Sequence, residues 1–275
     1  MPVLERSDLP RVSVGDLIEA GAHFGHHTSR WNPGMRPYIQ GVQHSIHLIN
    51  LRETLKGLIR AHRFLRSVAS QGKGILFVGT KRAAKDAVID AAQKTGMTHV
   101  SERWLGGTLT NYRTIRNRLA RLEELEGLMR DGLMAQYSKK QASALQRELK
   151  KILRNLGGIR NLKEIPGAVV IVDPKKEVNA VRECERIGVP SVALVDTDSD
   201  PSRVGIAVPA NDDAIRVVQV FLRVCVDAIV LGLSERVKTE PPPPAAGAKA
   251  APTAIPSAAG APMAVPPMAV PGARS

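Results

Sequence analysis

Cysteine and aromatic residues are both scarce in this 275-residue chain. The two cysteines, Cys184 and Cys225, lie far apart, each within a helical pattern, which excludes a disulfide framework and a Cys-x-x-Cys metal site. A reducing cytoplasm is therefore expected. Aromatic side chains make up 3% of the residues, too few for the stacking platforms of proteins that read single-stranded bases.

Targeting and membrane-spanning segments are also missing. The stretch from Met1 to Val14 has no apolar run, which argues against a signal peptide. The most apolar stretch, Ile215 to Leu233, is interrupted at spacings of four by Gln219, Arg223 and Asp227, so it predicts a mostly buried helix. No membrane partner is expected.

No complete catalytic motif occurs. The run from Gly74 to Lys81 approaches a phosphate-binding loop, but its Gly-Thr-Lys order is wrong and its first glycine precedes the predicted strand. The chain has no Gly-x-Gly-x-x-Gly fingerprint and no nucleophile elbow. His23, His26 and His27 do not follow the His-Glu-x-x-His spacing of zinc enzymes, so packing or RNA-facing roles are favoured over a metal site.

Acidic residues gather after a predicted strand, where the carboxyl ends of parallel strands usually place ligands. An EF-hand loop is excluded, because Pro201 and Ala207 stand where it needs glycine and glutamate. Turn and cap formation and a loosely held magnesium ion remain alternative roles for Asp196, Asp198 and Asp200, with Asp212 and Asp213 following.

Positive charge is abundant. Thirty-nine Lys and Arg against twenty-six Asp and Glu leave a net charge of +13, which makes a polyanion, and nucleic acid first, the expected partner. Almost none of this charge lies in the Pro- and Ala-rich stretch from Thr239 to Ser275. The basic surface therefore belongs to the ordered part of the chain.

Short apolar runs alternate with helical patterns, which predicts an α/β fold with a parallel sheet covered on both faces. The runs 75–78 and 169–172 are each followed by a predicted helix, over Lys81–Lys94 and Lys175–Ile187. Further strands are predicted at 191–195 and 205–208, with Asn211 opening the long helix from Ile215. The segment Tyr38 to Asn50 predicts a small hairpin with its turn at Gly41.

One region departs from this alternation. Leucines from 119 to 128 and apolar residues from 145 to 156, separated by Asp131-Gly132, predict an antiparallel helical hairpin with charged outer faces. Its charges suit either a solvated surface or a direct RNA contact. The predicted organisation is an N-terminal arm at 1–14, an α/β domain at 15–236 with the hairpin at about 111–156, and a disordered Pro/Ala-rich tail at 237–275.

Two cationic loops carry the strongest functional signal, because arginine forks suit phosphate groups. Each loop holds one of the two tryptophans, which either anchors the loop in the core or lies against RNA. Together with the turn after the strand at 75–78, they supply the candidate RNA-binding residues Arg30, Trp31, Asn32, Arg36, Lys81, Arg82, Arg103, Trp104, Asn111, Arg113 and Arg116.

Several long motifs of the chain, in this order, closely resemble the ribosomal protein S-2 family, also called uS2. The resemblance covers about residues 14–235. It includes the segment from Leu17 to His26, Arg30-Trp31-Asn32-Pro33, Ile46 to Leu51, Val78-Gly79-Thr80-Lys81, the segment from Arg103 to Asn111, the stretch from Pro166 to Pro190, Val195-Asp196-Thr197, and the segment from Pro209 to Ala214.

The resemblance implies a flavodoxin-like sheet with an inserted helical hairpin, and a structural, non-enzymatic role in the cytoplasmic small (30S) ribosomal subunit. It further implies binding to 16S rRNA and to other small-subunit proteins, support of assembly and translation, and help in docking ribosomal protein S-1, with no small-molecule substrate. Two other functional classes are weighed against it: a nucleotide-dependent α/β enzyme using Lys81 and the acids after residue 196, and a protein-docking module.

Overall fold

The computed structural model describes residues 12–239, apart from the side chains of residues 134, 135 and 237–239. The outer parts of the predicted N-terminal arm and tail, residues 1–11 and 240–275, lie outside the described residues. The helices are α1 (Val14–Ala20), α2 (Leu51–Ser70), α3 (Lys85–Thr95), α4 (Tyr112–Arg130), α5 (Lys139–Leu156), α6 (Val178–Ile187) and α7 (Ile215–Thr239). The strands are β1 (Phe24–His27), β2 (Ile39–Gln43), β3 (Ile46–Ile49), β4 (Ile75–Val78), β5 (Thr98–Val100), β6 (Ala168–Val172), β7 (Ser191–Val195) and β8 (Ile206–Pro209).

A five-stranded parallel sheet forms the centre, in the order β5-β4-β6-β7-β8. Taken in chain order these are strands 2-1-3-4-5, the order of flavodoxin-like doubly wound sheets. The predicted fold class is confirmed. In such a sheet the strand order reverses between its first and third strands, here β4 and β6, and ligands bind beside their carboxyl ends.

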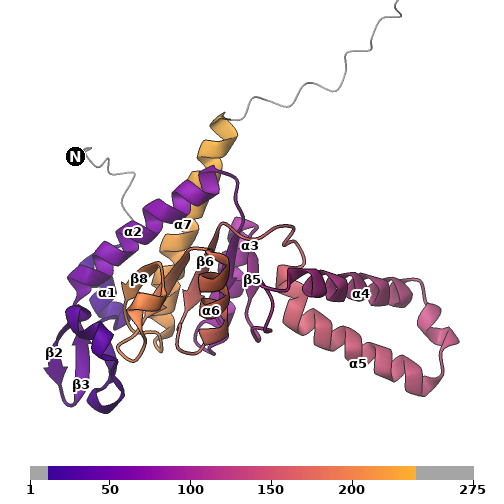
Figure 1. The fold of residues 1–275 in the computed structure, drawn as a ribbon, viewed down its shortest axis with the longest axis horizontal. Coiled ribbons are helices and arrows are strands. Elements are labelled where there is room, and N and C mark those ends of the chain that lie inside the picture. The colour runs from indigo at the N-terminus through magenta and orange to yellow at the C-terminus, as the bar shows by residue number, and fades with distance from the viewer. Residues whose placement is uncertain (1–11, 240–275) are drawn as a thin grey trace, which may run out of the picture. The chain divides into compact units, whose positions relative to one another are not determined.

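Helices cover both faces of this sheet (Figure 1). Ile75 and Phe77 of β4 point to one face and join a core cluster with residues of α2, α3 and α7. Leu76 and Val78 point to the other face and join a second cluster with α6 and the hairpin. Alternation of side chains along a strand explains this division, and burial on both sides explains why the strands are uniformly apolar.

Two glycines let α2 pack closely in the first cluster. A Cβ at Gly57 would lie 2.9 Å from the backbone oxygen of Ala207 in β8. A Cβ at Gly232 of α7 would collide with the backbone of α2 at Arg66. Helix α2 is therefore seated tightly against the sheet and α7, with its remaining face turned to solvent.

Helix α7 is long and apolar enough to span a membrane by length and composition over Ile215–Arg236, and half of that window is buried inside the protein. Its buried residues include Phe221, Cys225 and Ile229, which belong to the first core cluster. The helix packs in the core as predicted, although half of the window and not most of it is buried. Both cysteines are buried and unpaired with each other.

A second, antiparallel sheet in the order β1-β3-β2 precedes α2. The predicted hairpin is present, but its turn was wrongly placed. The chain turns at His44 and Ser45, which both adopt positive φ, whereas Gly41 lies within β2 beside an irregularity in register. Asn, Asp and His adopt positive φ more readily than most other residues, so the turn forms at His44 without a glycine.

The helical hairpin is formed by α4 and α5, as predicted (Figure 1). Its apolar seam continues the second core cluster, with buried Leu119, Leu122, Leu125, Leu149 and Ile152. The remaining surface of both helices is largely charged and exposed.

Helices α3 and α6 begin three to four residues later than predicted. The residues before α6 form a turn that begins at Asp173, whose φ is +62° and whose carboxylate accepts a hydrogen bond from the backbone N–H of Lys176. The residues before α3 form a turn in which Ala84 and Lys85 donate to the backbone oxygen of Lys81. Both turns lie at the carboxyl ends of β4 and β6.

Candidate functional site

The cationic loop between β5 and α4 is held by one carboxylate, that of Glu183 in α6. One oxygen accepts hydrogen bonds from Trp104 Nε1 at 2.9 Å and the Gly107 N–H at 2.8 Å. The other oxygen accepts from the N–H groups of Leu109 at 2.9 Å and Thr110 at 3.0 Å, and from the Thr110 hydroxyl at 3.1 Å. Glu183 is therefore the centre around which the loop from Arg103 to Asn111 is folded.

Burial alone would raise the pKa of Glu183, but the hydrogen bonds from Thr110, Trp104, Leu109 and Gly107 outweigh it and lower the pKa below its ordinary value. The carboxylate stays ionised at neutral pH. Trp104 is 6% exposed and Arg103 and Arg113 are exposed. Of the two roles considered for Trp104, the structure thus supports the anchor in the core.

A second glutamate holds the turn after β4. Glu177, buried at the start of α6, accepts hydrogen bonds from the backbone N–H and the hydroxyl of Thr80. Burial raises the pKa of Glu177 above its ordinary value, although the bonds from Thr80 oppose the change. The N–H and hydroxyl of Thr80, in the turn that resembles a phosphate-binding loop, therefore already donate to a carboxylate of the protein.

Lys81 lies in an ion cluster at the same edge of the sheet. Its Nζ is 2.6 Å from Asp212, 2.6 Å from Asp213 and 3.5 Å from Asp173. Burial would lower the pKa of Lys81, but the hydrogen bonds with Asp212 and Asp213 raise it overall. Burial and the neighbouring charges of Asp173 and Asp196 raise the pKa of Asp212. The Lys81 side chain is 17% exposed, and its ammonium holds the segments that follow β4, β6 and β8 together.

His26 of the small sheet joins this cluster from the opposite side. Its Nδ1 is 3.1 Å from Asp196, and its Nε2 is 3.6 Å from Asp213 and 3.9 Å from Asp198. The adjacent carboxylate of Asp196 raises the pKa of His26 to about 9, against the effect of burial. The protonated imidazole therefore ties the antiparallel sheet to the edge of the parallel one.

Three residues of this cluster could share a metal ion, since ligand atoms of His26, Asp196 and Asp212 lie within 4.8 Å of one another. They differ from the set predicted for magnesium. Asp200 turns away and caps a short helix at Pro201–Arg203 by accepting from Ser202, whereas Asp198 pairs with Lys175 at 2.9 Å. A metal ion there would have to displace the proton of His26 and the ammonium of Lys81, which already pair with Asp196 and Asp212.

The other cationic loop, from Arg30 to Pro37, is tied to the same edge. The N–H of Asn32 donates to the backbone oxygen of Thr197 at 2.8 Å, and the Asn32 side chain accepts from the Gly34 N–H at 2.8 Å. Met35 is fully buried beneath the loop. Trp31 is 36% exposed and its ring centroid lies 5.2 Å from that of His47, so an indole surface remains open to solvent.

The candidate RNA-binding residues thus divide into two groups. Trp104, Lys81 and Asn32 are engaged within the protein by the bonds described above. The outward-facing members are Arg30, Trp31, Arg36, Arg82, Arg103, Asn111, Arg113 and Arg116.

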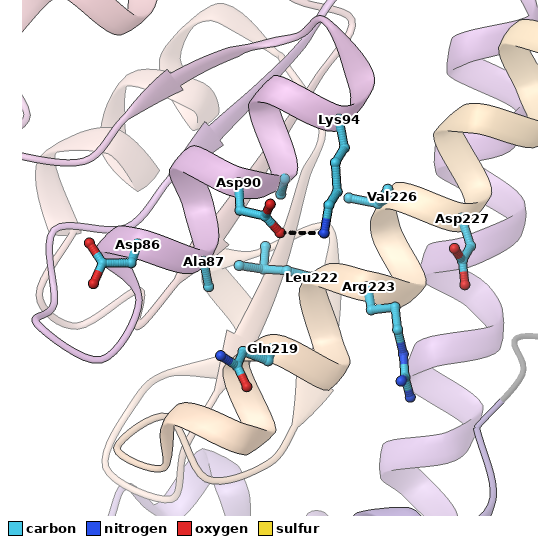
Figure 2. A pocket seen from close by; sticks show the side chains of 10 residues that line it. Asp86, Ala87, Asp90, Lys94, Gln219, Leu222, Arg223, Val226 and Asp227 are labelled. Atoms are coloured by element: carbon cyan, nitrogen blue, oxygen red, sulfur yellow. Dashed lines mark hydrogen bonds and ion pairs between the residues drawn. The ribbon is translucent and has the colours of Figure 1, made fainter.

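The remaining cavities are surface grooves. One of about 510 Å³ lies between α3 and α7, with an apolar floor that includes Leu222 and Val226. Figure 2 shows its charged rim, where Lys94 pairs with Asp90 at 2.6 Å. The rim does not bring catalytic side chains together, and the groove lies away from the carboxyl ends of the strands.

Sequence reasoning did not assign a role to Glu177, which holds the turn after β4, or to Glu183, which holds the loop from Arg103 to Asn111. Each sits about 75 to 100 residues from the groups it binds. The sequence offered one clue, which is that Glu177 and Glu183 are charged residues in a segment whose neighbouring residues pack against the core. Both are buried, and carboxylates are almost never buried without partners.

Comparison with known proteins gives a consistent result. A family model described as Ribosomal protein S2 matches residues 17–232. The chain is 53% identical to the small ribosomal subunit protein uS2 of Rhodopirellula baltica, over 88% of this chain and 91% of that protein. It is 45% identical to the protein of the same name from a Picosynechococcus species, over 82% and 88%, and 46% identical to that of Synechococcus elongatus, over 79% and 87%.

Proposed function

This chain belongs to the ribosomal protein S2 family, and we propose that it binds 16S rRNA through the outward-facing cations of its two loops, of the turn after β4 and of the start of α4. The family is a structural, non-enzymatic one of the small ribosomal subunit, so the chain is a cytoplasmic, ribosome-bound protein of translation and the nucleotide-dependent enzyme hypothesis is dropped. As a small-subunit protein it has rRNA and other ribosomal proteins as its neighbours.

The observation that carries the proposal is the lack of carboxylate partners at the loop cations. Among the described residues, no ion pair is formed by Arg30, Arg36, Arg82, Arg103, Arg113 or Arg116, and all six side chains are exposed. In contrast, the partly buried cation Lys81 is surrounded by three acids. Arg30, Arg36 and Arg103 lie on the two loops, which are fixed from behind by Met35 and Glu183, whereas Arg82 lies in the turn after β4 and Arg113 and Arg116 lie at the start of α4. Unpaired arginines at such fixed positions are suited to phosphate oxygens.

The mode of contact follows from composition. With few aromatic residues, binding would depend on the sugar-phosphate backbone and shape of folded RNA, with Trp31 as the one exposed indole among the candidates. Each phosphate neutralised releases counterions and adds about 0.7 to 0.9 to the slope of log K against log salt concentration.

The test uses the full chain and purified 16S rRNA. Replacing Arg103 and Arg113 by Gln should lower the affinity and reduce the salt slope by about 1.4 to 1.8. The matched control replaces Arg182 and Arg186, two exposed arginines of α6 that form no ion pair among the described residues. Equal affinity and slope for R103Q/R113Q and R182Q/R186Q would remove the loop from the interface.

We propose further that the chain helps dock ribosomal protein S-1. Exposed apolar side chains at the end of the hairpin, Met129, Leu133 and Tyr137, support a protein contact there, since they are costly to leave in water. Purified ribosomal protein S-1 should be retained by the wild-type chain and lost from M129S/L133S/Y137S. Retention by both proteins, or by neither, would contradict this assignment.

A further inference from the structure

The outer face of α2 carries a row of cations that no motif pointed to. Arg52, Lys56, Arg60 and Arg63 are exposed, and we call them the α2 ridge. At 3.6 residues per turn they fall within a sector of about 80° and extend over about 16 Å along the helix axis. The opposite face of α2 is buried against β8 and α7, so the ridge points to solvent.

Acidic partners are nearly absent from the ridge. The one acid of α2, Glu53, pairs with Lys56 at 2.7 Å. Among the described residues, Arg52, Arg60 and Arg63 form no ion pair with a carboxylate, and the nearby Glu235 of α7 is paired with Arg66. Like charges at spacings of three and four repel one another on a helix, so this row has a cost in the free protein that a bound polyanion would remove.

We propose that the α2 ridge binds a second stretch of RNA backbone, separate from the one at the loops. The ridge belongs to the face of the sheet covered by α2, α3 and α7. Arg103 and Arg113 flank Trp104, Leu109 and Ile115, which belong to the cluster on the other face. The protein would thus join two RNA segments lying on opposite sides of its sheet, an inference that rests on the proposed rRNA binding.

The chemistry favours RNA over a membrane surface. Three of the four cations are arginines, whose planar forks donate paired hydrogen bonds to phosphate oxygens. A helix that lies in a bilayer interface needs an apolar face turned outward, but the apolar face of α2 is buried in the core. Close packing at Gly57 holds α2 against β8, so the helix that carries the ridge is already positioned before RNA binds.

The test compares R60Q/R63Q with R182Q/R186Q, both in the full chain, and adds R52Q/K56Q/R60Q/R63Q. Circular dichroism should show unchanged folding, because all the side chains are exposed. The ridge pair should reduce the salt slope on 16S rRNA by about 1.4 to 1.8 and the quadruple variant by about twice that. Hydroxyl-radical footprinting should show that the nucleotides deprotected by R60Q/R63Q differ from those deprotected by R103Q/R113Q.

Each contrary result has its own meaning. If R60Q/R63Q behaves as R182Q/R186Q does while R103Q/R113Q loses affinity, the ridge inference is wrong and the proposed function stands. If the wild type does not bind 16S rRNA, both fail. If R60Q/R63Q keeps its rRNA affinity but loses binding to phosphatidylglycerol vesicles that the wild type shows, the ridge is a membrane contact and the inference is overturned.

Discussion

Replacing Glu183 by Gln tests how the cationic loop is held. The amide keeps one accepting oxygen and turns the other into an N–H2 donor, which then faces either Leu109 and Thr110 or Trp104 and Gly107. Two N–H donors lose their acceptor in either orientation, and on the Thr110 side the hydroxyl must also turn away. Each N–H left without an acceptor costs about 1 to 3 kcal/mol. We therefore expect E183Q to lower the free energy of unfolding by about 2 to 6 kcal/mol.

Urea unfolding followed by circular dichroism measures this loss. The control is E185Q, a change two residues along the same helix. It breaks the solvent-accessible ion pair between Glu185 and Arg203 and should cost about 0 to 1 kcal/mol. The reasoning is refuted if E183Q is no less stable than E185Q. An affinity for 16S rRNA that is unchanged in folded E183Q would separately refute the role of Glu183 in presenting Arg103.

The pH dependence has a definite sign. Because the pKa of Glu183 is lowered in the folded protein, its stabilising effect is fully present above its ordinary value of 4.5 and is lost as the pH falls through the lowered pKa. The difference in unfolding free energy between wild type and E183Q should therefore be largest near pH 6 to 7 and shrink below about pH 4.5. A difference that grows on acidification contradicts the assignment.

Three further predictions concern packing, charge and metal. Gly57→Ala should destabilise the protein by about 1 to 3 kcal/mol, because the added Cβ would collide with β8. Gly127→Ala in α4 should stabilise it by about 0.5 to 1 kcal/mol, because a Cβ there meets no other atom. A thermal melt in which Gly57→Ala is the more stable variant would refute this packing. Lys81→Met should cost about 3 kcal/mol or more in urea unfolding, since it leaves the buried Asp212 and the nearby Asp173 without the Lys81 cation; wild-type stability would disprove the role of the cluster. Calorimetric titration with Zn²⁺ or Mg²⁺ should show no saturable binding at the His26 cluster near pH 7, because the protonated His26 and the ammonium of Lys81 already pair with its carboxylates; saturable binding that is lost in Asp212→Asn would contradict this.

The parallel sheet and the hairpin were predictable because their signals are local. Apolar runs such as 169–172 and the leucine spacing of α4 each report burial within a few residues. Strand β5 has three residues, Thr98 to Val100, with a threonine and a histidine, and this gave no comparable signal. The turn at His44 was missed because a non-glycine residue adopts positive φ there.

The exposed arginines of the candidate site could be predicted from the sequence, but the contacts that arrange the site could not. Charge and loop composition were enough to select Arg30 and Arg103, which are exposed. They could not separate these from Lys81 or Trp104, whose engagement depends on Asp212 and Glu183 more than 70 residues away. Contacts between distant segments decide which cations remain free, and no local pattern encodes them.

The most direct test of the central claim is sedimentation of a cell lysate through sucrose gradients at about 0.1 M and about 1 M monovalent salt, with the wild-type chain, R103Q/R113Q and R182Q/R186Q followed by mass spectrometry. The account predicts that the wild type and R182Q/R186Q migrate with the small subunit at low salt. R103Q/R113Q should be released at a lower salt concentration than either, because fewer phosphate contacts hold it. Release of all three proteins at the same salt concentration would contradict the account.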